Sequence, residues 1–331
     1  MEQQYVSCIR EQLHAVLGID SPSGCTEEVQ QYLCDTLRAM GYAPRRLVKG
    51  GVHVTLGGEG EPLTLLAHAD TLGAVVQYIK PNGRLAISNM TLNVHNVEAE
   101  NVKVITRFNG AYEGTLQLCN ASVHVNPDPN QARDLNKNME IVLDYDVKTK
   151  EDVEKMGILP GDAIALEPRL RITETGYVKS RYLDDKASVV ALLTLAKWVS
   201  DNHIRLKRRV DMLFTVYEEI DHGGACGIAD DTVELLAVDM GCVGDNVICT
   251  ERQVSICAKD NSGPYNREFV NKLIRCAQQE ALDYAVDIYY SYSSDASVAI
   301  RTGYDVRHAL IGPGAVSYTH LRAHETPEHL V

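Results

Sequence analysis

The sequence predicts an α/β fold, a mostly parallel sheet with helices on both faces, which carries an inserted small β domain. Two observations support this prediction. Strand-like and helix-like segments alternate over residues 1–70 and 181–314, and such alternation is typical of a parallel sheet covered by helices. Over residues 71–180 the helical spacing fades, and short β-prone pieces stand between Gly, Asn, Pro and Asp, which indicates a separate β domain.

The framework begins with two helices and two strands. Residues 4–18 place apolar side chains at helical spacing, and a second helix follows, with Thr26 as its expected N-cap and Gly41 at its end. Strands are expected at 52–56 and 63–70. The second is apolar throughout, as a strand buried on both faces should be.

In the inserted segment the pieces that stand out are short and β-prone. Its β-prone pieces are GAVVQYI, VKVITRF, TLQLC, SVHV, MEIVLDYDV and DAIALE. The framework resumes with a strong helix at 182–200. It is followed by predicted strands at 208–219 and 233–241, a helix at 266–282, a strand in YAVDIYYSY, a short helix in DASVAIRTG and a last strand in HALIGPG.

Composition and charge argue against several classes of protein. The net charge of −13 disfavours a nucleic-acid backbone as a partner, and no apolar run is long enough to span a membrane. The chain starts without the pattern of a secretory signal. Its nine cysteines include no CxxC pair, which favours a reducing, cytoplasmic location, and Cys34 and Cys276 are expected to be buried thiols.

Acidic residues and one histidine gather at the predicted strand ends and in the loops that follow. They stand in four short motifs: AHAD (His68, Asp70), YLDDK (Asp184, Asp185), YEEIDHGG (Glu218, Glu219) and AVDMG (Asp239). Because sites in an open parallel sheet gather at the carboxyl ends of the strands, these distant residues can converge. Such a crowd of carboxylates requires cations, since like charges raise one another's pKa.

Taken singly, each of these residues has an ordinary structural explanation, which competes with the site. His68 would be a core histidine, Asp70 a turn cap, Asp184 a helix N-cap, the two glutamates a solvated strand end, and Asp239 a turn residue. Only their combination favours a metal site.

A mixed set of His and carboxylate ligands suits Zn²⁺, Co²⁺ or Mn²⁺ better than Ca²⁺ or Mg²⁺. A carboxylate that bridges two ions about 3.5–4 Å apart is a known plan of hydrolytic dinuclear sites. The adjacent glutamates fit this plan, because one can bind metal while the other stays free to take a proton from water.

The ordered motifs His-x-Asp, Asp-Asp, Glu-Glu followed by glycines, Val-Asp-x-Gly, Ser-Asp-Ala and Gly-Pro-Gly resemble the M42 peptidases, glutamyl aminopeptidase-like metalloenzymes. The resemblance runs through about Gly314 and implies a zinc-exopeptidase-like fold with two divalent ions per subunit, zinc or cobalt. It implies that His68 binds one ion, that Asp184 bridges both, that Glu219 binds the first ion and that Asp239 binds the second.

The same resemblance implies the remaining roles. Glu218 would be the general base and acid, and Asp70 would orient His68. Ser294 and Asp295 match a family loop near the substrate, although the chain has Ser-Ser-Asp-Ala where Gly-Thr-Asp-Ala is commoner. Lys186 stands where arginine is more usual.

The implied reaction is the removal of N-terminal residues from peptides, with Glu218 as general base on a water that bridges the two ions. Members of the family assemble into dimers and often tetrahedral dodecamers through the inserted domain. The resemblance therefore implies peptide substrates and a homo-oligomer, and it implies neither a nucleic-acid nor a membrane partner.

The end of the chain departs from the family pattern, in which a histidine ligand follows the Gly-Pro-Gly turn. His320 is the nearest candidate and His324 the next, but three of the eleven histidines stand in the last twelve residues, where no apolar helical face is visible. We expect residues 315–331 to be a non-native tail and His320 to be there by chance. The ion at Asp239 would then be held more weakly than the ion at Glu219.

Other functions compete with the aminopeptidase. A related metallo-amidohydrolase or deacylase would carry its inserted domain after the Glu-Glu strand, whereas here the insertion precedes Asp184. A glycanase needs a carboxylate pair that flanks a sugar bond, and here the carboxylates are better used by metal. A chain without its last ligand could also be a catalytically impaired assembly subunit.

Overall fold

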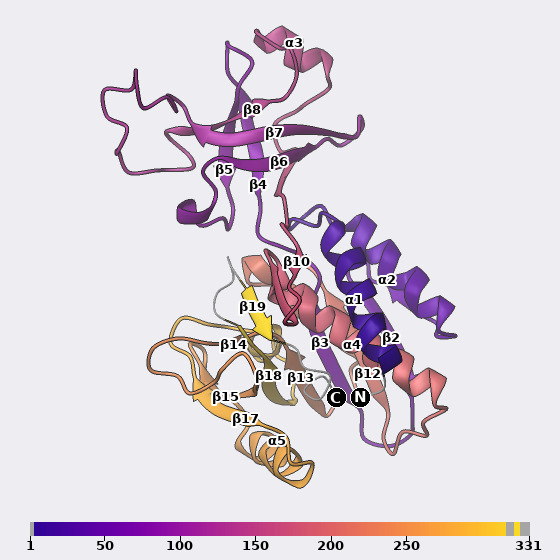
Figure 1. Cartoon of the computed structure of the whole chain (residues 1–331). Helices are drawn as coiled ribbons and strands as arrows, with labels where there is room; N and C mark the ends of the chain where they lie inside the picture. Colours follow the sequence, from indigo (N-terminus) through magenta and orange to yellow (C-terminus); the bar gives the residue numbers. More distant parts are fainter. Residues whose placement is uncertain (1–2, 316–320, 325–331) are drawn as a thin grey trace. The chain divides into compact units, whose positions relative to one another are not determined.

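The computed structural model describes residues 3–315 and 321–324, and it divides them into two compact units (Figure 1). The first unit contains the chain up to residue 21, residues 26–71 and the chain from residue 168 onward, and the second contains residues 22–25 and 72–167. The segment 168–180, assigned to the β domain from sequence, groups instead with the first unit. Its short strands look like those of the insertion, so composition alone could not place it.

The first unit is built on one ten-stranded sheet with the order β1-β2-β12-β3-β13-β18-β15-β16, where β14 pairs with β18 and β17 with β15. The strands are β1 (Arg45–Arg46), β2 (Val52–Gly57), β3 (Leu63–His68), β12 (Val210–Thr215), β13 (Glu234–Val238), β14 (Gly241–Cys242), β15 (Val254–Asp260), β16 (Gly263–Pro264), β17 (Tyr284–Ile288) and β18 (Arg307–Ala315).

The centre of this sheet is parallel and its flanks are not. β12, β3, β13 and β18 run parallel to their neighbours in that row, whereas β2 is antiparallel to β12 and β15 is antiparallel to β18. The predicted mostly parallel sheet is therefore a mixed sheet. The buried centre has the apolar sequence of parallel strands, and β3 is almost wholly buried.

The helices of the first unit are α1 (Gln3–Gly18), α2 (Glu27–Ala39), α4 (Leu183–Asp201), α5 (Arg267–Gln279) and α6 (Asp295–Arg301). α1 packs against α4, and α4 packs against β3, while α6 packs against β13 and β18. Each helix was predicted from its apolar spacing, and α4 is buried over most of its length, which suits its position beside the central strand.

Two expectations about these helices are wrong. Thr26 stands at the N-cap position of α2 but makes no capping bond, because its hydroxyl accepts a hydrogen bond from the Gln30 amide instead. Cys34 is buried as predicted, whereas Cys276 is exposed. On α5 the buried stripe passes through Phe269 and Ala277, and Cys276 lies off it.

A second, three-stranded sheet of this unit joins β10 (Arg171–Ile172), β11 (Tyr177–Ser180) and β19 (Leu321–His324). β19 pairs antiparallel with β11 through its backbone. The proposal that residues 315–331 are non-native stays a prediction.

The second unit is a closed barrel with the order β4-β5-β8-β7-β6-β9. Its elements are β4 (Ala74–Ile79), β5 (Leu85–Asn89), the 3₁₀ turn η1 (Val94–Asn96), β6 (Glu100–Ile105), β7 (Ala111–Leu118), β8 (Met139–Leu143), α3 (Lys150–Lys155) and β9 (Ala163–Leu166). The piece SVHV, predicted as a strand, forms turns, and its two valines are exposed. No helix in the described parts of the chain has the length and apolarity needed to cross a membrane.

Candidate active site

The candidate site lies where the central parallel strands of the first unit end. His68 is the last residue of β3 and pairs with Thr215, the last residue of β12, while Asp239 directly follows β13. Asp184 stands in the first turn of α4, which packs against β3. The structure thus brings together chain-distant residues at the carboxyl ends of parallel strands, where the sequence predicted a site.

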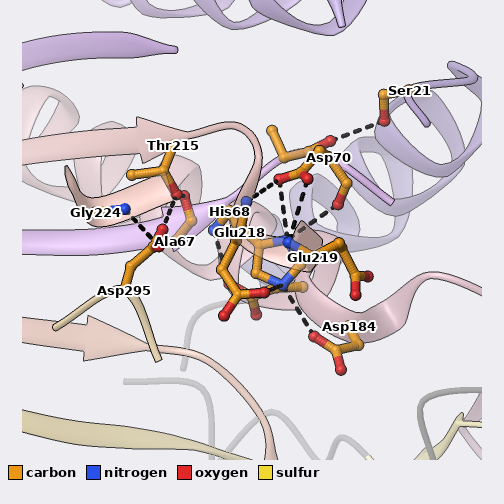
Figure 2. Close-up of polar contacts among 12 residues, drawn as sticks. Ser21, Ala67, His68, Asp70, Asp184, Thr215, Glu218, Glu219, Gly224 and Asp295 are labelled. Atoms are coloured by element: carbon orange, nitrogen blue, oxygen red, sulfur yellow. Dashed lines mark hydrogen bonds and ion pairs between the residues drawn. The ribbon is translucent and has the colours of Figure 1, made fainter. Parts of the chain in front are cut away.

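His68 is the centre of a compact group of side chains. Its Nε2 atom lies 3.1 Å from Asp184 Oδ1 and 3.7 Å from Glu218 Oε2 (Figure 2). One ligand atom each from His68, Asp184 and Asp239 lies within 4.8 Å of the others, which is a spacing that a single ion can span. His68 is 2% exposed and Asp239 5% exposed, so this group is largely shielded from water.

Asp70 holds the site through two different groups. Its backbone carbonyl lies 3.0 Å from His68 Nδ1, and its carboxylate lies 3.6 Å from the same atom. The carboxylate oxygens also accept the backbone N–H groups of Glu218, at 3.1 Å, and Glu219, at 3.4 Å. Asp70, which is fully buried, therefore contacts the imidazole and also anchors the glutamate pair.

The sequence predicted a strand over residues 208–219 that includes the glutamate pair. In the structure the pair lies beyond the end of that strand. β12 ends at Thr215, and Tyr217 takes a left-handed backbone conformation with φ of 70°. Glu218 and Glu219 then lie in the 3₁₀ turn η2 (Glu218–Ile220). The two side chains are therefore placed by a turn and not by strand alternation. Within the described residues, Glu219 is outside the group formed by His68, Asp184 and Asp239.

Burial and mutual repulsion make this group of carboxyls hard to ionise. Burial, with the negative charge of neighbouring carboxylates, raises the pKa of Glu218 and of Glu219 well above the usual value. The same causes raise the pKa of Asp239 to about 7. Burial opposes a charged imidazole, but the charge of Glu218 and the bonds to Asp184 and Asp70 raise the pKa of His68 well above its ordinary value.

These donors fit divalent cations. Among the described residues, the ion pairs that the structure shows for Asp184 and Glu218 are both with His68. A cation favours the charged form of each carboxyl and would relieve the repulsion that raises their pKa values. Imidazole nitrogen with carboxylate oxygen is also the donor set that zinc and related ions accept.

Ser294 and Asp295, predicted near the substrate, are both turned toward the protein. Ser294 is the N-cap of α6, where its hydroxyl accepts the N–H of Ser297, and it also bonds the Tyr265 hydroxyl. The Asp295 carboxylate is bonded by the Thr215 hydroxyl and by a backbone N–H of the loop after the glutamates.

Sequence reasoning did not assign a role to three further residues beside the site. Asp185 is fully buried and accepts the His68 backbone N–H at 3.1 Å. Lys186 is also fully buried and donates to the carbonyl of Ile19 at 2.5 Å, and burial lowers its pKa to about 7. A lysine at the start of an otherwise apolar helix was the signal for that buried position.

The third residue is Tyr292, whose hydroxyl is buried. Burial and the charge of Asp239 raise the pKa of this phenol well above its usual range. Four tyrosines crowd the stretch between Tyr284 and Tyr292, so the sequence alone did not distinguish this one. Of the predicted ligands, His320 lies outside the described residues, and His324 is described only through the backbone of β19.

Comparison with known proteins adds independent findings. A family model described as M42 glutamyl aminopeptidase matches residues 50–326. The chain is 41% identical over 320 residues to a Bacillus subtilis protein named "Putative aminopeptidase YhfE", with 96% of this chain and 92% of that protein covered.

Solved structures with the same fold include the Pyrococcus horikoshii TET1 peptidase, with a TM-score of 0.84, 21% identity and coverage of 96% of this chain and 94% of that one. A TET aminopeptidase from a marine-sediment Thaumarchaeota archaeon has a TM-score of 0.84 and 18% identity, covering 95% of this chain and 91% of that one. At such identities the likeness shows the fold.

Proposed function

Because the chain belongs to the M42 glutamyl aminopeptidase family and is therefore a peptide hydrolase, we propose that it is a dinuclear metal-dependent aminopeptidase that uses Glu218 as its general base. The observation that carries this proposal is the buried group of His68, Asp184 and Asp239, with Glu218 Oε2 3.7 Å from the imidazole. The group combines metal-binding donors with a second kind of carboxylate, that of Glu218, which lies near the same imidazole. Hydrolytic metal sites require both.

Two ions would be held by His68, Asp184, Asp239 and Glu219, with Asp184 shared between them. The raised pKa values of Asp239 and Glu219 support this assignment, because they mark negative charge that the described residues leave without a lysine or arginine partner. Divalent ions in such a site polarise the scissile carbonyl and lower the pKa of water. Zinc and cobalt suit this donor set best.

Glu218 would move the proton. As the oxygen of water forms its bond to the carbonyl carbon, the carboxylate takes the proton that water loses. It then delivers this proton to the amine nitrogen as the C–N bond breaks, so that the peptide leaves as a neutral amine. Its raised pKa supports the role, because a base must be able to hold the proton between these two steps. The Asp70 carboxylate keeps Glu218 in place by accepting the backbone N–H of Glu218.

The substrates would be peptides with a free N-terminus, whose ammonium group the acidic site attracts. We further propose that the chain forms a homo-oligomer through the barrel of residues 72–167. Support comes from the structural relative, since the P. horikoshii TET1 peptidase can assemble into a tetrahedron or a large octahedral shell.

The test is hydrolysis of aminoacyl-p-nitroanilides by chelator-treated protein, with and without added Zn²⁺ or Co²⁺. We expect release of nitroaniline only with metal, and a loss of about 10²- to 10⁴-fold in kcat for Glu218→Gln. An N-acetylated substrate, assayed for the release of acetate, serves as the control, because a deacylase would release acetate from it and an aminopeptidase would leave it intact. Activity that survives chelation, or that ignores the substitution, would contradict the mechanism, and an inactive wild type would favour an assembly subunit.

A further inference from the structure

The loop that carries Glu218 and Glu219 is closed at its base by one carboxylate. β12 ends at Thr215, and after the glutamates the chain enters the 3₁₀ turn η3 (Gly223–Ala225). Asp295 accepts the Thr215 hydroxyl at 2.5 Å with Oδ2 and the Gly224 N–H at 2.5 Å with Oδ1 (Figure 2). One side chain thus joins the two ends of the loop.

The two glycines of η3 are required by this contact. A Cβ atom on Gly223 would lie 2.5 Å from both carboxylate oxygens of Asp295, and one on Gly224 would lie 2.1 Å from the Asp295 carbonyl oxygen. A side chain at Gly224 would require the Asp295 backbone to move, and one at Gly223 would displace the Asp295 carboxylate. The loop therefore lies directly against the first residue of α6, and the glycines that follow the glutamates are explained by Asp295.

The loop needs anchors because its backbone is strained. Tyr217 and Asp221, on either side of the glutamates, have φ values of 70° and 65°, a region that side-chain-bearing residues rarely adopt. A residue in this conformation persists only where its surroundings hold it. Asp70 holds the middle of the loop through two N–H groups, and Asp295 holds its ends.

Asp295 is itself fixed by a buried polar network. The Ser294 hydroxyl lies 2.8 Å from that of Tyr265, which donates to Asp260 Oδ2 at 2.9 Å. The Ser297 hydroxyl donates to the same oxygen at 2.5 Å. Asp260 and Ser294 are fully buried, so the N-terminus of α6 is a rigid platform.

We propose that Asp295 is a positioning residue, which sets Glu218 against His68 by tying Thr215 to Gly224, and that it does not contact the substrate. This inference rests on the proposed function, because the group it positions is the proposed general base. Replacing Asp295 with asparagine can separate the effect of its hydrogen-bond geometry from the effect of its negative charge. An asparagine could accept the Gly224 N–H and donate to Thr215 Oγ1, whose own hydrogen could turn to the Ala67 carbonyl, 3.4 Å away. A residue that bound the substrate's ammonium group would lose its effect with its charge.

The experiment compares Asp295→Ala with Asp295→Asn in the metal-loaded protein, using aminoacyl-p-nitroanilides. We expect Asp295→Ala to lower kcat by about 10- to 100-fold, since a small displacement of a catalytic group has that effect, while KM stays within about twofold. Asp295→Asn should recover most of the lost kcat. If both variants instead raise KM alike with kcat unchanged, Asp295 binds substrate and the proposal is wrong.

A second readout does not depend on activity. Hydrogen–deuterium exchange of metal-free protein should show faster exchange over residues 216–224 in Asp295→Ala and near-wild-type exchange in Asp295→Asn. Asp287→Ala is the matched control, because this buried aspartate accepts two N–H groups, from Ile248 and Cys249, in another loop. It should speed exchange there and leave residues 216–224 and kcat unchanged.

Unchanged exchange over 216–224 in Asp295→Ala would overturn the inference. Failure of the proposed function shows differently, as a wild type without metal-dependent hydrolysis, and the exchange result still decides whether Asp295 ties the loop. If Asp295→Ala does not fold, Thr215→Val removes one of the two bonds and keeps the shape of the strand residue. It should give the same changes at smaller size, and wild-type kcat and exchange in this variant would count against the tie.

Discussion

At the scale of single residues, the site is a set of acids whose protonation depends on what they bind. Asp239, with its pKa raised to about 7, retains much of its proton at neutral pH, and Glu218 and Glu219 are shifted the same way. Metal ligands must be deprotonated, so a cation has to displace these protons. Its affinity is therefore coupled to pH.

We predict that metal binding releases protons and strengthens as pH rises. A cation stabilises the charged carboxylates and lowers their pKa, so at a pH near or below 7 at least one proton per chain should leave on binding, and affinity should rise by about tenfold per pH unit for each proton released. Calorimetry of Zn²⁺ or Co²⁺ binding between pH 6 and 8, repeated in buffers of different ionisation enthalpy, measures both quantities. If the metal affinity is constant over this pH range and the binding enthalpy does not depend on the buffer, the carboxyls are already ionised in the metal-free protein.

The motifs predicted which residues come together more completely than they predicted the contacts of each side chain. The convergence of His68, Asp184 and Asp239 follows from parallel strand ends, which a sequence can indicate. The position of Asp295 could not be foreseen, because its partners Thr215 and Gly224 are distant in sequence and belong to a loop whose path depends on two left-handed residues. Motif similarity suggested the substrate, and only the contacts showed that the carboxylate faces the protein.

At the scale of elements, the helices of the sheet unit were predicted well, but α3 of the barrel unit was missed and strand ends were predicted poorly. The buried spacing of α1 and α4 is local and survives folding, whereas β12 stops at Thr215 although the apolar letters continue to Val216 and Tyr217. A strand ends where its hydrogen bonds to the neighbouring strands end, and the sequence of one strand does not show which strands will be its neighbours. The antiparallel flanks of the sheet were missed for the same reason.

The end of β13 that is remote from the active site is held by a cluster of ion pairs. Glu234, the first residue of the strand, accepts Arg208 and Lys272 (2.7 Å from Nζ), and Arg307 of the adjacent β18 lies 3.2 Å away. Burial favours the neutral acid, but the bonds from Lys272 and Arg208 prevail and lower the pKa of Glu234 to about 2. The cluster thus holds β13 in register at the end remote from the active site.

We predict that Glu234→Gln destabilises the fold at neutral pH without changing the site. The folded pKa lies below the unfolded value of about 4.3, so the contribution is present above that pH and is lost as pH falls toward 2. Because Lys272 is 44% exposed, solvent screening keeps the loss to about 1–2 kcal/mol at pH 7. Urea unfolding at pH 7 and pH 3 measures it. A difference from wild type that is as large at pH 3 as at pH 7 would assign the loss to packing.

At the scale of the whole molecule, the barrel and the sheet unit are two compact units. On the barrel unit, Phe108, Val123 and Val125 are 83%, 64% and 73% exposed. The sheet unit also exposes large apolar side chains, among them Ile248 at 69% and Tyr290 at 76%, so exposure by itself does not select one unit as the interface. The inserted unit contributes none of the grouped metal-binding residues, which supports the proposal that it serves assembly.

We therefore predict that a charged side chain introduced on the barrel reduces the number of subunits in the oligomer and leaves the hydrolytic activity of each subunit unchanged. Phe108→Glu should shift the mass measured by light scattering on a sizing column from an oligomer to a smaller species. Its kcat on a small nitroanilide should stay within about twofold, because Phe108 belongs to the barrel and the grouped ligands belong to the other unit. Val48→Glu is the matched control, since Val48 is also fully exposed but lies in the sheet unit. If the control changes the mass and Phe108→Glu does not, assembly uses the sheet unit, and the barrel must be assigned another role.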